Sequence, residues 1–468
     1  MMTLGQAAWA AGAQLVRGEA ALALTGVFTD TRAPIQGGLF VALKGENHDG
    51  ADFAQQAVAS GAAAVLVARE SAAKVPAGLA AALLTAPDTT RALGGLAAAH
   101  RRRFAELRVV AITGSTGKTS TKELVASVLE AAGPTLKTEG NLNNEIGVPL
   151  TLFKLAKEHR FAAVECGMNH LGEIARLAHL CDPDVGLVTN VGPVHLEGCG
   201  TLDGVAHAKG ELFHALREHA MAVANADDAR VLTQARLSRR KLFTFGVSHA
   251  ADVKVISVQH GGPGLQAELE FSGARHKVEL KLLGAHNAHN AAAAAAVGLA
   301  LGLDAATILR GLASATTPGR RMRPVQLPNG ALLIDDCYNA NPASTKAALL
   351  TLSQLVKPRG RTLAVLGDML ELGPTELDLH RDVGRYAAST QVSQLICFGA
   401  RAKAIGEGAG QGGLASECVE YTEDPAEAAR LVQSRARPED VVLVKGSRGM
   451  KMERISDALS GLSPGEGH

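Results

Sequence analysis

The stretch that decides the fold is Val109-Val110-Ala111-Ile112-Thr113-Gly114-Ser115-Thr116-Gly117-Lys118-Thr119-Ser120. Its β-branched apolar start predicts a buried strand, and the helically spaced apolar residues after it predict a helix that ends before Gly133-Pro134. Between the two, backbone N–H groups, the helix dipole and a lysine can hold phosphate oxygens, while a threonine hydroxyl can hold Mg²⁺. The sequence therefore predicts a phosphate-binding loop.

This loop departs from the usual phosphate-binding motif in one respect. The first glycine of the motif would fall at Ile112, so only Gly114-x-x-Gly117-Lys118-Thr119 remains. The alternative is a glycine-rich turn with a solvated lysine. Because a strand, a turn and a helix are all expected in order, phosphate binding is the better interpretation.

The composition is that of an ordinary soluble protein. Its 468 residues suggest about three domains, and 47 Lys and Arg against 46 Asp and Glu leave a net charge of +1. This balance offers no electrostatic footprint for nucleic acid or an anionic membrane, so we expect neither as a partner. Six cysteines without a C-x-x-C pair, and no signal peptide or membrane-spanning run, lead us to expect a cytoplasmic protein.

Residues 1–105 are expected to form a small α/β unit. The turn Thr29-Asp30-Thr31-Arg32 could bind a diphosphate or a uracil edge, although on its own a plain polar turn is the better interpretation. Further on, Arg101, Arg102 and Arg103 lead into the strand of the phosphate-binding loop. We expect them on a solvated connecting helix.

Polar residues follow the next strands. Glu165 ends the run 161–164, and an acidic residue at such a place beside a phosphate-binding loop commonly holds Mg²⁺. His195 follows the predicted strand 185–190, and ligands gather at the carboxyl ends of parallel strands. The two side chains could thus face one crevice, although a lone histidine is as often structural. The asparagine-rich loop 137–149 either presents amide groups or is a plain turn.

Lys209 is an anomaly in its helix. It lies seven residues from both Leu202 and Leu216, on the apolar stripe. Burying a bare ammonium is costly unless it is paired or altered. Either the side chain reaches along the stripe to solvent, or Lys209 serves the site, for instance as a carbamate that ligates a metal.

The second half of the chain changes pattern twice. Residues 241–283 predict antiparallel strands, and an alanine-rich helix follows, in which Asn287 and Asn290 could read an adenine edge or Asn287 could cap the helix. The segment 316–321 is expected to be a domain boundary whose arginine could reach a γ-phosphate. A hairpin and alternating strands and helices then predict a doubly wound sheet.

These pieces, in this order, resemble the Mur ligases, ATP-dependent amide-forming enzymes of bacterial peptidoglycan synthesis. The match is closest to the members that add D-alanyl-D-alanine to UDP-N-acetylmuramoyl-tripeptide (UDP-MurNAc-tripeptide), and the family's loop also lacks the first glycine. Its most specific motifs are Thr-Gly-Ser-Thr-Gly-Lys-Thr at 113–119, Gly-Asn-Leu-Asn-Asn-Glu at 140–145, Glu-Cys-Gly-Met-Asn at 165–169, His-Asn-Ala-His-Asn at 286–290, Asp-Asp-Cys-Tyr-Asn-Ala-Asn-Pro at 335–342, Leu-Gly-Asp-Met-Leu-Glu-Leu-Gly at 366–373 and Lys-Gly-Ser-Arg at 445–448.

The resemblance implies an α/β fold of three domains. Residues 1–105 would form a small α/β UDP-binding domain, and residues 106–317 a central P-loop, parallel-sheet ATPase domain with an antiparallel flap. Residues 318–468 would form a Rossmann-like doubly wound domain that binds the incoming dipeptide and closes the site. The partners would be UDP-MurNAc-tripeptide and D-Ala-D-Ala, ligated by a monomer through an acyl phosphate; no general base is identified.

The resemblance also implies roles for particular residues. ATP would be bound by Gly114, Ser115, Thr116, Gly117, Lys118, Thr119, Ser120, Asn287, Asn290, Arg320 and Asp336. Two Mg²⁺ ions would be held by Thr119, Glu165, His195 and carbamylated Lys209. Catalysis would depend on Lys118, Lys209, His195 and Arg320. The UDP substrate would be bound by Thr29, Asp30, Thr31, Arg32, Asn141 and Asn144. The dipeptide would be bound by Asn339, Lys445, Ser447 and Arg448.

Two relatives and one other class are alternatives. The ligase that adds diaminopimelate or lysine typically has an Asp-Asn-Pro-Arg motif, which this sequence lacks. Folylpolyglutamate synthetase shares the ATPase and C-terminal domains but has no UDP-binding domain. A P-loop switch or transport ATPase would hydrolyse nucleotide for a partner, and the guanine-binding Asn-Lys-x-Asp motif is absent.

Overall fold

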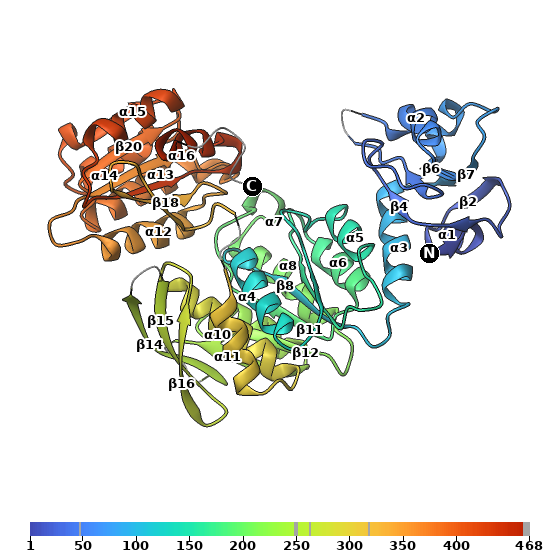
Figure 1. Ribbon diagram of the computed structural model, residues 1–468, viewed down its shortest axis with the longest axis horizontal. Helices are drawn as coiled ribbons and strands as arrows, with labels where there is room; N and C mark the ends of the chain where they lie inside the picture. Colours follow the sequence, from blue (N-terminus) through green and yellow to red (C-terminus); the bar gives the residue numbers. More distant parts are fainter. Residues whose placement is uncertain (46–47, 248–250, 262–263, 317–318, 462–468) are drawn as a thin grey trace.

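The structure, a computed structural model, describes residues 1–45, 48–247, 251–261, 264–316 and 319–461. Its strands form three larger sheets, each from one continuous stretch of chain, and one ribbon of β1 (Met2–Thr3) with β3 (Ala23–Leu24). In Figure 1 the first and last parts of the chain lie on either side of the molecule, with the central part between them. No described helix is both long and apolar enough to cross a membrane.

The N-terminal sheet has five strands in the order β2-β7-β6-β5-β4, parallel except for β2. Its two longest strands are buried along their whole length, as their alanine, valine and leucine residues predict. Helices α1 (Leu4–Ala10), α2 (Ala54–Ala59) and α3 (Thr89–Arg101) accompany it. The strands are β2 (Gln14–Arg17), β4 (Val27–Phe28), β5 (Leu39–Val41), β6 (Ala64–Ala68) and β7 (Ala82–Ala86).

The last residue of α3 joins this part to the central one. Arg101 was expected in solvent but is only 4% exposed, whereas Arg102 is exposed as predicted. The Arg101 guanidinium donates hydrogen bonds to the carbonyls of Cys181 (3.0 Å) and Asp182 (3.2 Å), at the end of α6 (Glu173–Cys181). The expectation of a solvated helix end is therefore wrong for Arg101, because helix α6 offers its terminal carbonyls as acceptors.

The central sheet has nine strands in the order β16-β15-β14-β13-β12-β11-β8-β10-β9. The predicted strand is β8 (Arg108–Thr113), which lies between β10 and β11 and is buried from Val109 onward. Helices cover both faces, α4 (Lys118–Glu130), α10 (His286–Ala300) and α11 (Ala305–Ser314) on one, and α5 (Gly147–Leu152), α6, α8 (Leu202–His214) and α9 (Ala229–Leu237) on the other. The other parallel strands are β9 (Thr135–Lys137), β10 (Phe161–Glu165), β11 (Val185–Val188), β12 (Met221–Asn225) and β13 (Lys241–Gly246).

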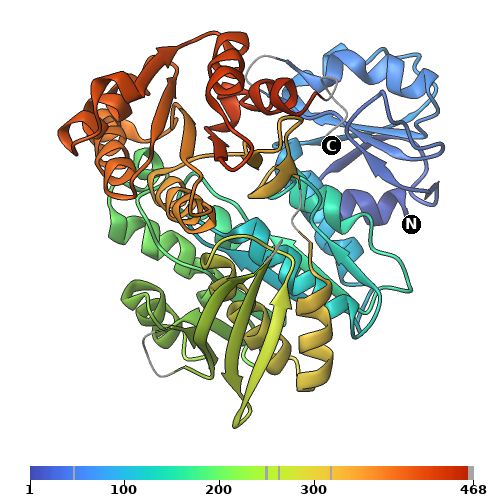
Figure 2. The same ribbon diagram turned by 60° about the vertical axis from the view of Figure 1, so that its left-hand side comes forward.

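The predicted flap consists of β14 (Val253–Gly261), β15 (Gly264–Phe271) and β16 (Ala274–Leu280), which pair antiparallel and form the lower edge of the molecule in Figure 2. The expectation is wrong for Lys241–Gly246, which pairs parallel with β12. Helix α9 connects β12 to β13, and such a crossover permits parallel pairing that alternating side chains do not reveal.

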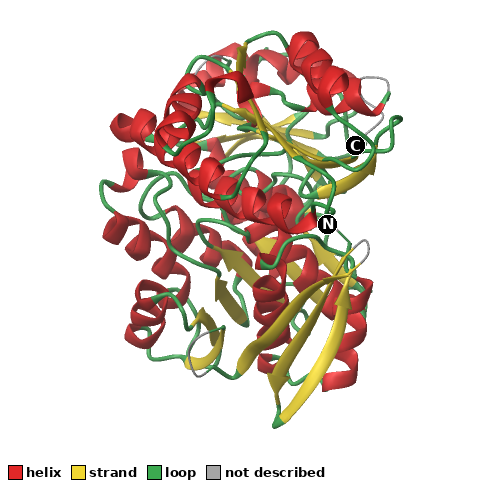
Figure 3. Ribbon diagram, turned by 90° about the vertical axis from the view of Figure 1, so that its left-hand side faces the viewer, coloured by secondary structure: helices red, strands yellow, loops and turns green. Residues whose placement is uncertain are grey.

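The C-terminal sheet has the order β17-β18-β22-β19-β20-β21 and is parallel except for β17. Figure 3 shows helices on both of its faces, as predicted for a doubly wound sheet. The predicted hairpin joins β17 to β18, and Asn341 caps α12 by accepting a hydrogen bond from the Ser344 N–H (2.9 Å). The elements are β17 (Arg323–Gln326), β18 (Leu332–Asp336), α12 (Pro342–Leu355), β19 (Thr362–Gly367), α13 (Glu376–Ser389), β20 (Gln394–Phe398), α14 (Lys403–Gln411), β21 (Val419–Thr422), α15 (Pro425–Arg435), β22 (Val441–Lys445) and α16 (Glu453–Ser460). The expected boundary at 317–318 lies outside the described residues.

Arg101→Met should lower the free energy of unfolding by about 2–4 kcal/mol, because it leaves buried carbonyls without donors. Arg102→Met is the matched control, since the Arg102 side chain is exposed. The measurement is urea unfolding of both variants followed by circular dichroism. Equal unfolding midpoints for the two variants would contradict the role given to Arg101.

Candidate active site

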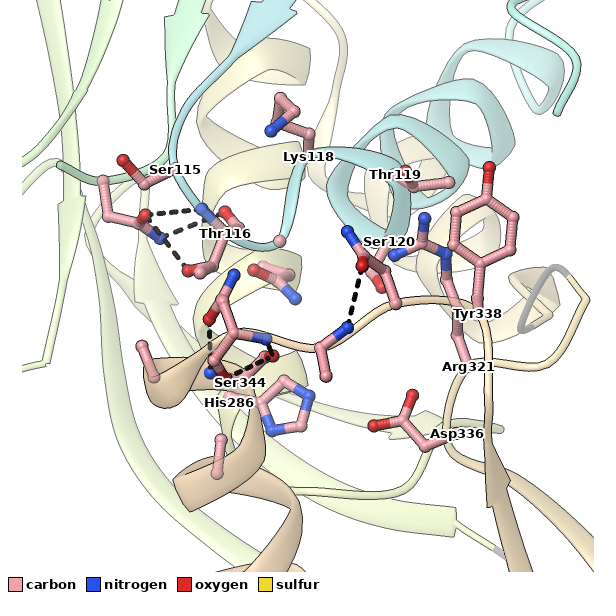
Figure 4. Close-up of a pocket in the computed structure, with 18 of the residues that line it drawn as sticks. Ser115, Thr116, Lys118, Thr119, Ser120, His286, Arg321, Asp336, Tyr338 and Ser344 are labelled. Atoms are coloured by element: carbon pink, nitrogen blue, oxygen red, sulfur yellow. Dashed lines mark hydrogen bonds between the residues drawn. The ribbon is translucent and has the colours of Figure 1, made fainter. Parts of the chain in front are cut away.

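A cavity of about 750 Å³ lies between the central and C-terminal sheets. Figure 4 shows that Thr119 and Ser120 at the start of α4 lie near Arg321 and Tyr338 from the C-terminal part. The predicted site residues that line this cavity are Ser115, Thr116, Gly117, Lys118, Thr119, Ser120, Asn141, Glu165, His195, Asn287, Asn290, Asp336, Asn339, Lys445 and Arg448.

Two glycines shape the loop between β8 and α4. Gly114 has φ 149° and Gly117 has φ 77°, both in the region that favours glycine. A Cβ atom on Gly114 would lie 2.0 Å from Thr189 Oγ1, so the loop can approach the end of β11 only without a side chain there. Gly117 is the N-cap of α4, and the N–H groups after it therefore begin a helix N-terminus.

The neighbouring strand end holds this loop in place. Thr116 N–H donates to Asn190 Oδ1 (2.9 Å), and the Thr116 carbonyl accepts from Asn190 Nδ2 (3.1 Å) and Thr189 Oγ1 (2.7 Å). Ser115 N–H donates to the Asn190 carbonyl (2.9 Å). Asn190 also lines the cavity, so it is a site residue that the sequence analysis did not single out, although it ends a predicted strand.

Lys118 is held inside the loop. Its Nζ donates a hydrogen bond to the Gly114 carbonyl (2.8 Å). Burial lowers the pKa of Lys118, the Glu165 carboxylate raises it, and the guanidinium of Arg321 lowers it further. The lysine therefore lies where an added anion would relieve the unfavourable burial of its charge.

Glu165 lies at the end of β10, where the sequence predicted an acidic ligand. It is 2% exposed; its Oε1 accepts a hydrogen bond from Asn143 Nδ2 (2.8 Å), and its Oε2 has no partner among the described residues. Asn143, not predicted as a site residue, therefore orients the carboxylate. The predicted Asn144 instead uses its Oδ1 to accept from Ile146 N–H (3.2 Å) and Gly147 N–H (2.8 Å) at the start of α5, and it does not line the cavity.

His195 has a left-handed backbone (φ 54°) and forms the N-cap of the short helix α7 (Leu196–Cys199). Burial, together with the smaller effects of the Lys209 and Lys118 charges, lowers the pKa of His195 to about 4. The imidazole is therefore neutral at pH 7 and has a nitrogen lone pair available to a metal ion.

Lys209 lies in α8 and its side chain is fully buried. Its Nζ has no hydrogen-bond partner among the described residues. Burial lowers its pKa well below the usual value, and Lys118 acts in the same direction. The alternative in which the ammonium reaches solvent is therefore excluded for this structure, and the amine is held where its neutral form is favoured.

Helix α10 brings two asparagines to the cavity. Asn287 Nδ2 donates to the Leu283 carbonyl (2.7 Å), and Asn290 Nδ2 donates to Asn287 Oδ1 (2.9 Å). The N-cap of α10 is Ala285, so the capping alternative for Asn287 is wrong. Two residues of the same turn, His286 and His289, also line the cavity and were not predicted.

The C-terminal wall of the cavity carries paired charges. Lys445 Nζ donates to Asp336 Oδ2 (2.7 Å) and to the Asn339 carbonyl (2.9 Å), all at the ends of adjacent strands β18 and β22. Two guanidiniums lie near the Tyr338 ring, that of Arg321 at 4.0 Å and that of Arg448 at 5.6 Å from its centroid. A cationic wall thus faces the phosphate-binding loop.

Comparison with known proteins identifies this arrangement. Residues 23–101 match the description "Mur ligase family, catalytic domain", residues 112–298 match "Mur ligase middle domain", and residues 320–448 match "Mur ligase, glutamate ligase domain". The chain belongs to the Mur ligase family.

Among similar proteins is the UDP-N-acetylmuramoyl-tripeptide--D-alanyl-D-alanine ligase of Escherichia coli, 40% identical over 94% of each chain. The protein of that name from Bacillus subtilis is 35% identical over 92% of each chain. A structure of MurF from Acinetobacter baumannii superposes with a TM-score of 0.88 at 33% identity, covering 98% of this chain and 99% of that one. MurF ligase from Thermotoga maritima in complex with ADP has a TM-score of 0.83 at 28% identity, covering 93% and 97%. These likenesses confirm the predicted three-domain α/β fold.

In this Mur ligase, Arg320 lies away from the cavity. It is 8% exposed, and its guanidinium donates to Asp335 (3.2 Å) and Asp457 (2.6 Å) inside the C-terminal part. Its neighbour Arg321 lines the cavity instead. The structure thus corrects the placement of Arg320 at the γ-phosphate, because two aspartates already bind its charge.

The predicted UDP-binding turn follows β4 in the N-terminal part of this Mur ligase. Asp30 and Arg32 form an exposed ion pair (2.7 Å), in which hydrogen bonds from Arg32 lower the pKa of Asp30 to about 2. None of Thr29, Asp30, Thr31 and Arg32 lines the cavity at Lys118. Ser447 lines only a smaller neighbouring cavity.

The imidazole of His195 should titrate with a midpoint of about 4 in the ligand-free protein, chiefly because burial disfavours its charged form. As pH falls, His195 is protonated in the unfolded chain at a higher pH than in the folded protein. Its contribution therefore lowers the free energy of unfolding between pH 6.5 and about 4. The measurements are histidine NMR titration and urea unfolding across this range, in which His195→Asn should lessen the loss of stability. A midpoint near 6.5 would contradict the burial argument.

Proposed function

We propose that this Mur ligase joins D-alanyl-D-alanine to UDP-MurNAc-tripeptide and splits ATP into ADP and phosphate. The observation that carries the proposal is the 40% identity to the relative of that name over 94% of both chains, which spans both walls of the cavity. A carboxylate is a poor acyl donor, since oxide would have to leave. Transfer of the γ-phosphoryl group makes an acyl phosphate, from which phosphate leaves readily.

ATP binds at the start of α4 in this proposal. The N–H groups after Gly117 and the helix dipole favour phosphate oxygens, and Lys118 Nζ exchanges the Gly114 carbonyl for them. Asn287 and Asn290 lie beside this loop, since a Cβ atom on Gly117 would be 3.0 Å from Asn290 Oδ1. The structure of the Thermotoga maritima relative is a complex with ADP, which supports the proposal that a nucleotide binds at this loop.

Magnesium fits the central wall. Among the described residues, no three His, Cys, Asp or Glu side chains lie close enough to hold a metal ion alone. The chain would therefore contribute Thr119, Glu165 and His195, and the nucleotide would contribute phosphate oxygens. The unpartnered Oε2 of buried Glu165 fits such a role. Mg²⁺ supplies charge neutralisation during phosphoryl transfer.

Lys209 is proposed to be carbamylated. Its buried amine has no hydrogen-bond partner among the described residues and favours the neutral form, which is the form that reacts with carbon dioxide. The neutral amine attacks carbon dioxide, a carboxylate-like carbamate anion forms, and the nitrogen releases one proton. The carbamate would then support the second Mg²⁺ beside His195, whose pKa already responds to Lys209.

Charge repulsion between the γ-phosphate and the substrate carboxylate opposes the reaction. Lys118 from the central wall and Arg321 from the C-terminal wall face the same cavity and offset that repulsion. We assign to Arg321 the part that the resemblance gave to Arg320. Asp336, which accepts a hydrogen bond from Lys445, keeps the role that the resemblance implies, near the ribose of ATP.

The remaining proposals concern the residues that bind the UDP substrate and the dipeptide. Thr29, Asp30, Thr31, Arg32, Asn141 and Asn144 would bind the UDP substrate. Asn339, Lys445, Ser447 and Arg448 would bind the dipeptide. Of the latter, Lys445 and Ser447 form close hydrogen bonds to protein groups, whereas Arg448 has only a long ion pair with Glu453 (3.6 Å), so Arg448 would contact the dipeptide carboxylate directly. We propose that the enzyme acts as a cytoplasmic monomer without nucleic-acid or membrane partners.

The alternative ligases share the fold of this chain. The diaminopimelate ligase structure is 20% identical with a TM-score of 0.57, and Mycobacterium tuberculosis folylpolyglutamate synthase is 18% identical with a TM-score of 0.64. Likeness at this level concerns architecture alone. The more similar relatives therefore favour D-alanyl-D-alanine as the acceptor.

Phosphate release from ATP should require both UDP-MurNAc-tripeptide and D-Ala-D-Ala. Lys118→Ala should slow it by roughly 10²–10³-fold, because a preorganised charge at the phosphates is lost. Exposed Lys277 on β16 gives the matched control, Lys277→Ala, which should turn over normally. The measurement is a coupled phosphate assay with each substrate omitted in turn. Equal release without D-Ala-D-Ala, or with diaminopimelate in its place, would refute the proposed function.

Lys209→Ala should lose roughly 10²–10³-fold in turnover and recover part of it with added short carboxylates, which replace the missing anion. Wild-type protein in ¹³C-bicarbonate should show a carbamate carbon signal that Lys209→Ala lacks. Lys277→Ala should keep the signal. A wild-type protein without that signal, together with no carboxylate rescue, would count against carbamylation.

A further inference from the structure

A second cavity of about 200 Å³ adjoins the larger one. Its central wall holds Lys118 and His195, and its C-terminal wall holds Glu371 and Arg448. Glu371 also lines the larger cavity, so its side chain lies at the junction of the two spaces.

The loop that carries Glu371 is anchored on both sides. Leu370 N–H donates to Ser447 Oγ (2.9 Å), and Ser447 N–H donates to the Asp368 carbonyl (3.0 Å). After Glu371, the Leu372 side chain is buried in the C-terminal core. The loop backbone therefore cannot shift freely around Glu371.

Glu371 has φ 62°, a left-handed conformation that favours glycine over a long side chain. Such a conformation persists only when the surroundings impose it, and it is more common at functional sites than elsewhere. The anchored neighbours impose it here. They keep an exposed carboxylate at the edge of both cavities.

Glu371 is the acidic residue of this site that has no protein partner among the described residues. Of the described residues that line the smaller cavity, it alone is acidic, among the basic residues Lys118, His195 and Arg448. The larger cavity has two other carboxylates, but Glu165 accepts from Asn143 and Asp336 is paired with Lys445. Glu371 makes neither an ion pair nor a hydrogen bond with any described residue.

The acceptor of the reaction brings a complementary charge. A dipeptide is a zwitterion at neutral pH, with an ammonium at one end and a carboxylate at the other. The ammonium has no lone pair and cannot attack an acyl carbon until it loses a proton. The smaller cavity offers Glu371 to the ammonium and Arg448 to the carboxylate, beside the wall where the acyl phosphate would form.

We propose that Glu371 binds the ammonium of the incoming D-alanyl-D-alanine and accepts the proton that this group must lose before it attacks. The inference rests on the proposed function and adds the base that the sequence did not identify. The freed nitrogen lone pair forms the N–C bond, and the C–O bond to phosphate breaks with its electron pair on phosphate. After the attack the nitrogen carries two protons, of which the amide keeps one. The other proton leaves with the departing phosphate.

Hydroxylamine separates this role from the preceding step, because it is uncharged at neutral pH and traps acyl phosphates without being deprotonated first. Wild-type protein, Glu371→Gln and Glu371→Asp are given ATP, UDP-MurNAc-tripeptide and either hydroxylamine or D-Ala-D-Ala. Glu423→Gln is the matched control, an exposed acid of the same part of the chain that lines neither cavity. Hydroxamate, ligated product and the melting temperature are measured.

Glu371→Gln should form hydroxamate within about twofold of wild type but lose about 10²-fold or more in ligation of D-Ala-D-Ala. Glu371→Asp should retain part of the ligation, and Glu423→Gln all of it. Ligation by Glu371→Gln at the wild-type rate would overturn the inference, as would equal loss of hydroxamate and ligated product. Wild-type protein that forms hydroxamate but no D-Ala-D-Ala product would refute the proposed function itself.

Discussion

The approach of the β8–α4 loop to the end of β11 is the contact on which the site depends. At Gly114 a single methyl group would collide with Thr189, and the hydrogen bonds to Asn190 would be lost with that contact. Because the loop is fixed in this way, the first residues of α4 line one cavity and Lys118 is held by the Gly114 carbonyl. The phosphate-binding geometry is thus a property of two adjacent strand ends.

The opposite wall has a different construction. Its charges are presented by side chains from β18, β22 and the loops after them, and several are already paired within the C-terminal part, as Lys445 is with Asp336. Pairing fixes their positions before any ligand binds, which lowers the reorganisation required during the reaction. Arg321 and Glu371 form no ion pair with any described residue, and Arg448 forms only a long one with Glu453 (3.6 Å), so two cationic groups and one anionic group are left to meet ligands. Two cationic groups and one anionic group suit a reaction in which anionic phosphates and one ammonium group bind in the same cavity.

Much of this arrangement could be predicted because it depends on local chain chemistry. The β-branched run at 109–113, the Asn341-Pro342 helix start and the hairpin before β18 are each determined by neighbouring residues, and the structure contains all three. Glu165 and His195 were found because strand ends of a parallel sheet share an edge. The resemblance to Mur ligases added roles that spacing alone does not supply.

Other features depend on contacts that the sequence does not display. Arg320 and Arg321 are adjacent and chemically identical, and only the aspartates around Arg320 decide which one faces the cavity. Likewise Asn143 and Asn144 differ only in direction, one towards Glu165 and one towards the start of α5. The direction of β13 was missed because its partner is chosen by the crossover helix before it.

The buried guanidinium of Arg101 has a mechanical consequence. It connects the end of α3 to the end of α6 through two hydrogen bonds, which would stretch together if the N-terminal part rotated against the central sheet. That joint therefore acts as a rigid-body connection. This connection favours movement on the other side of the central sheet, where the two walls of the cavity meet, over rotation of the N-terminal part.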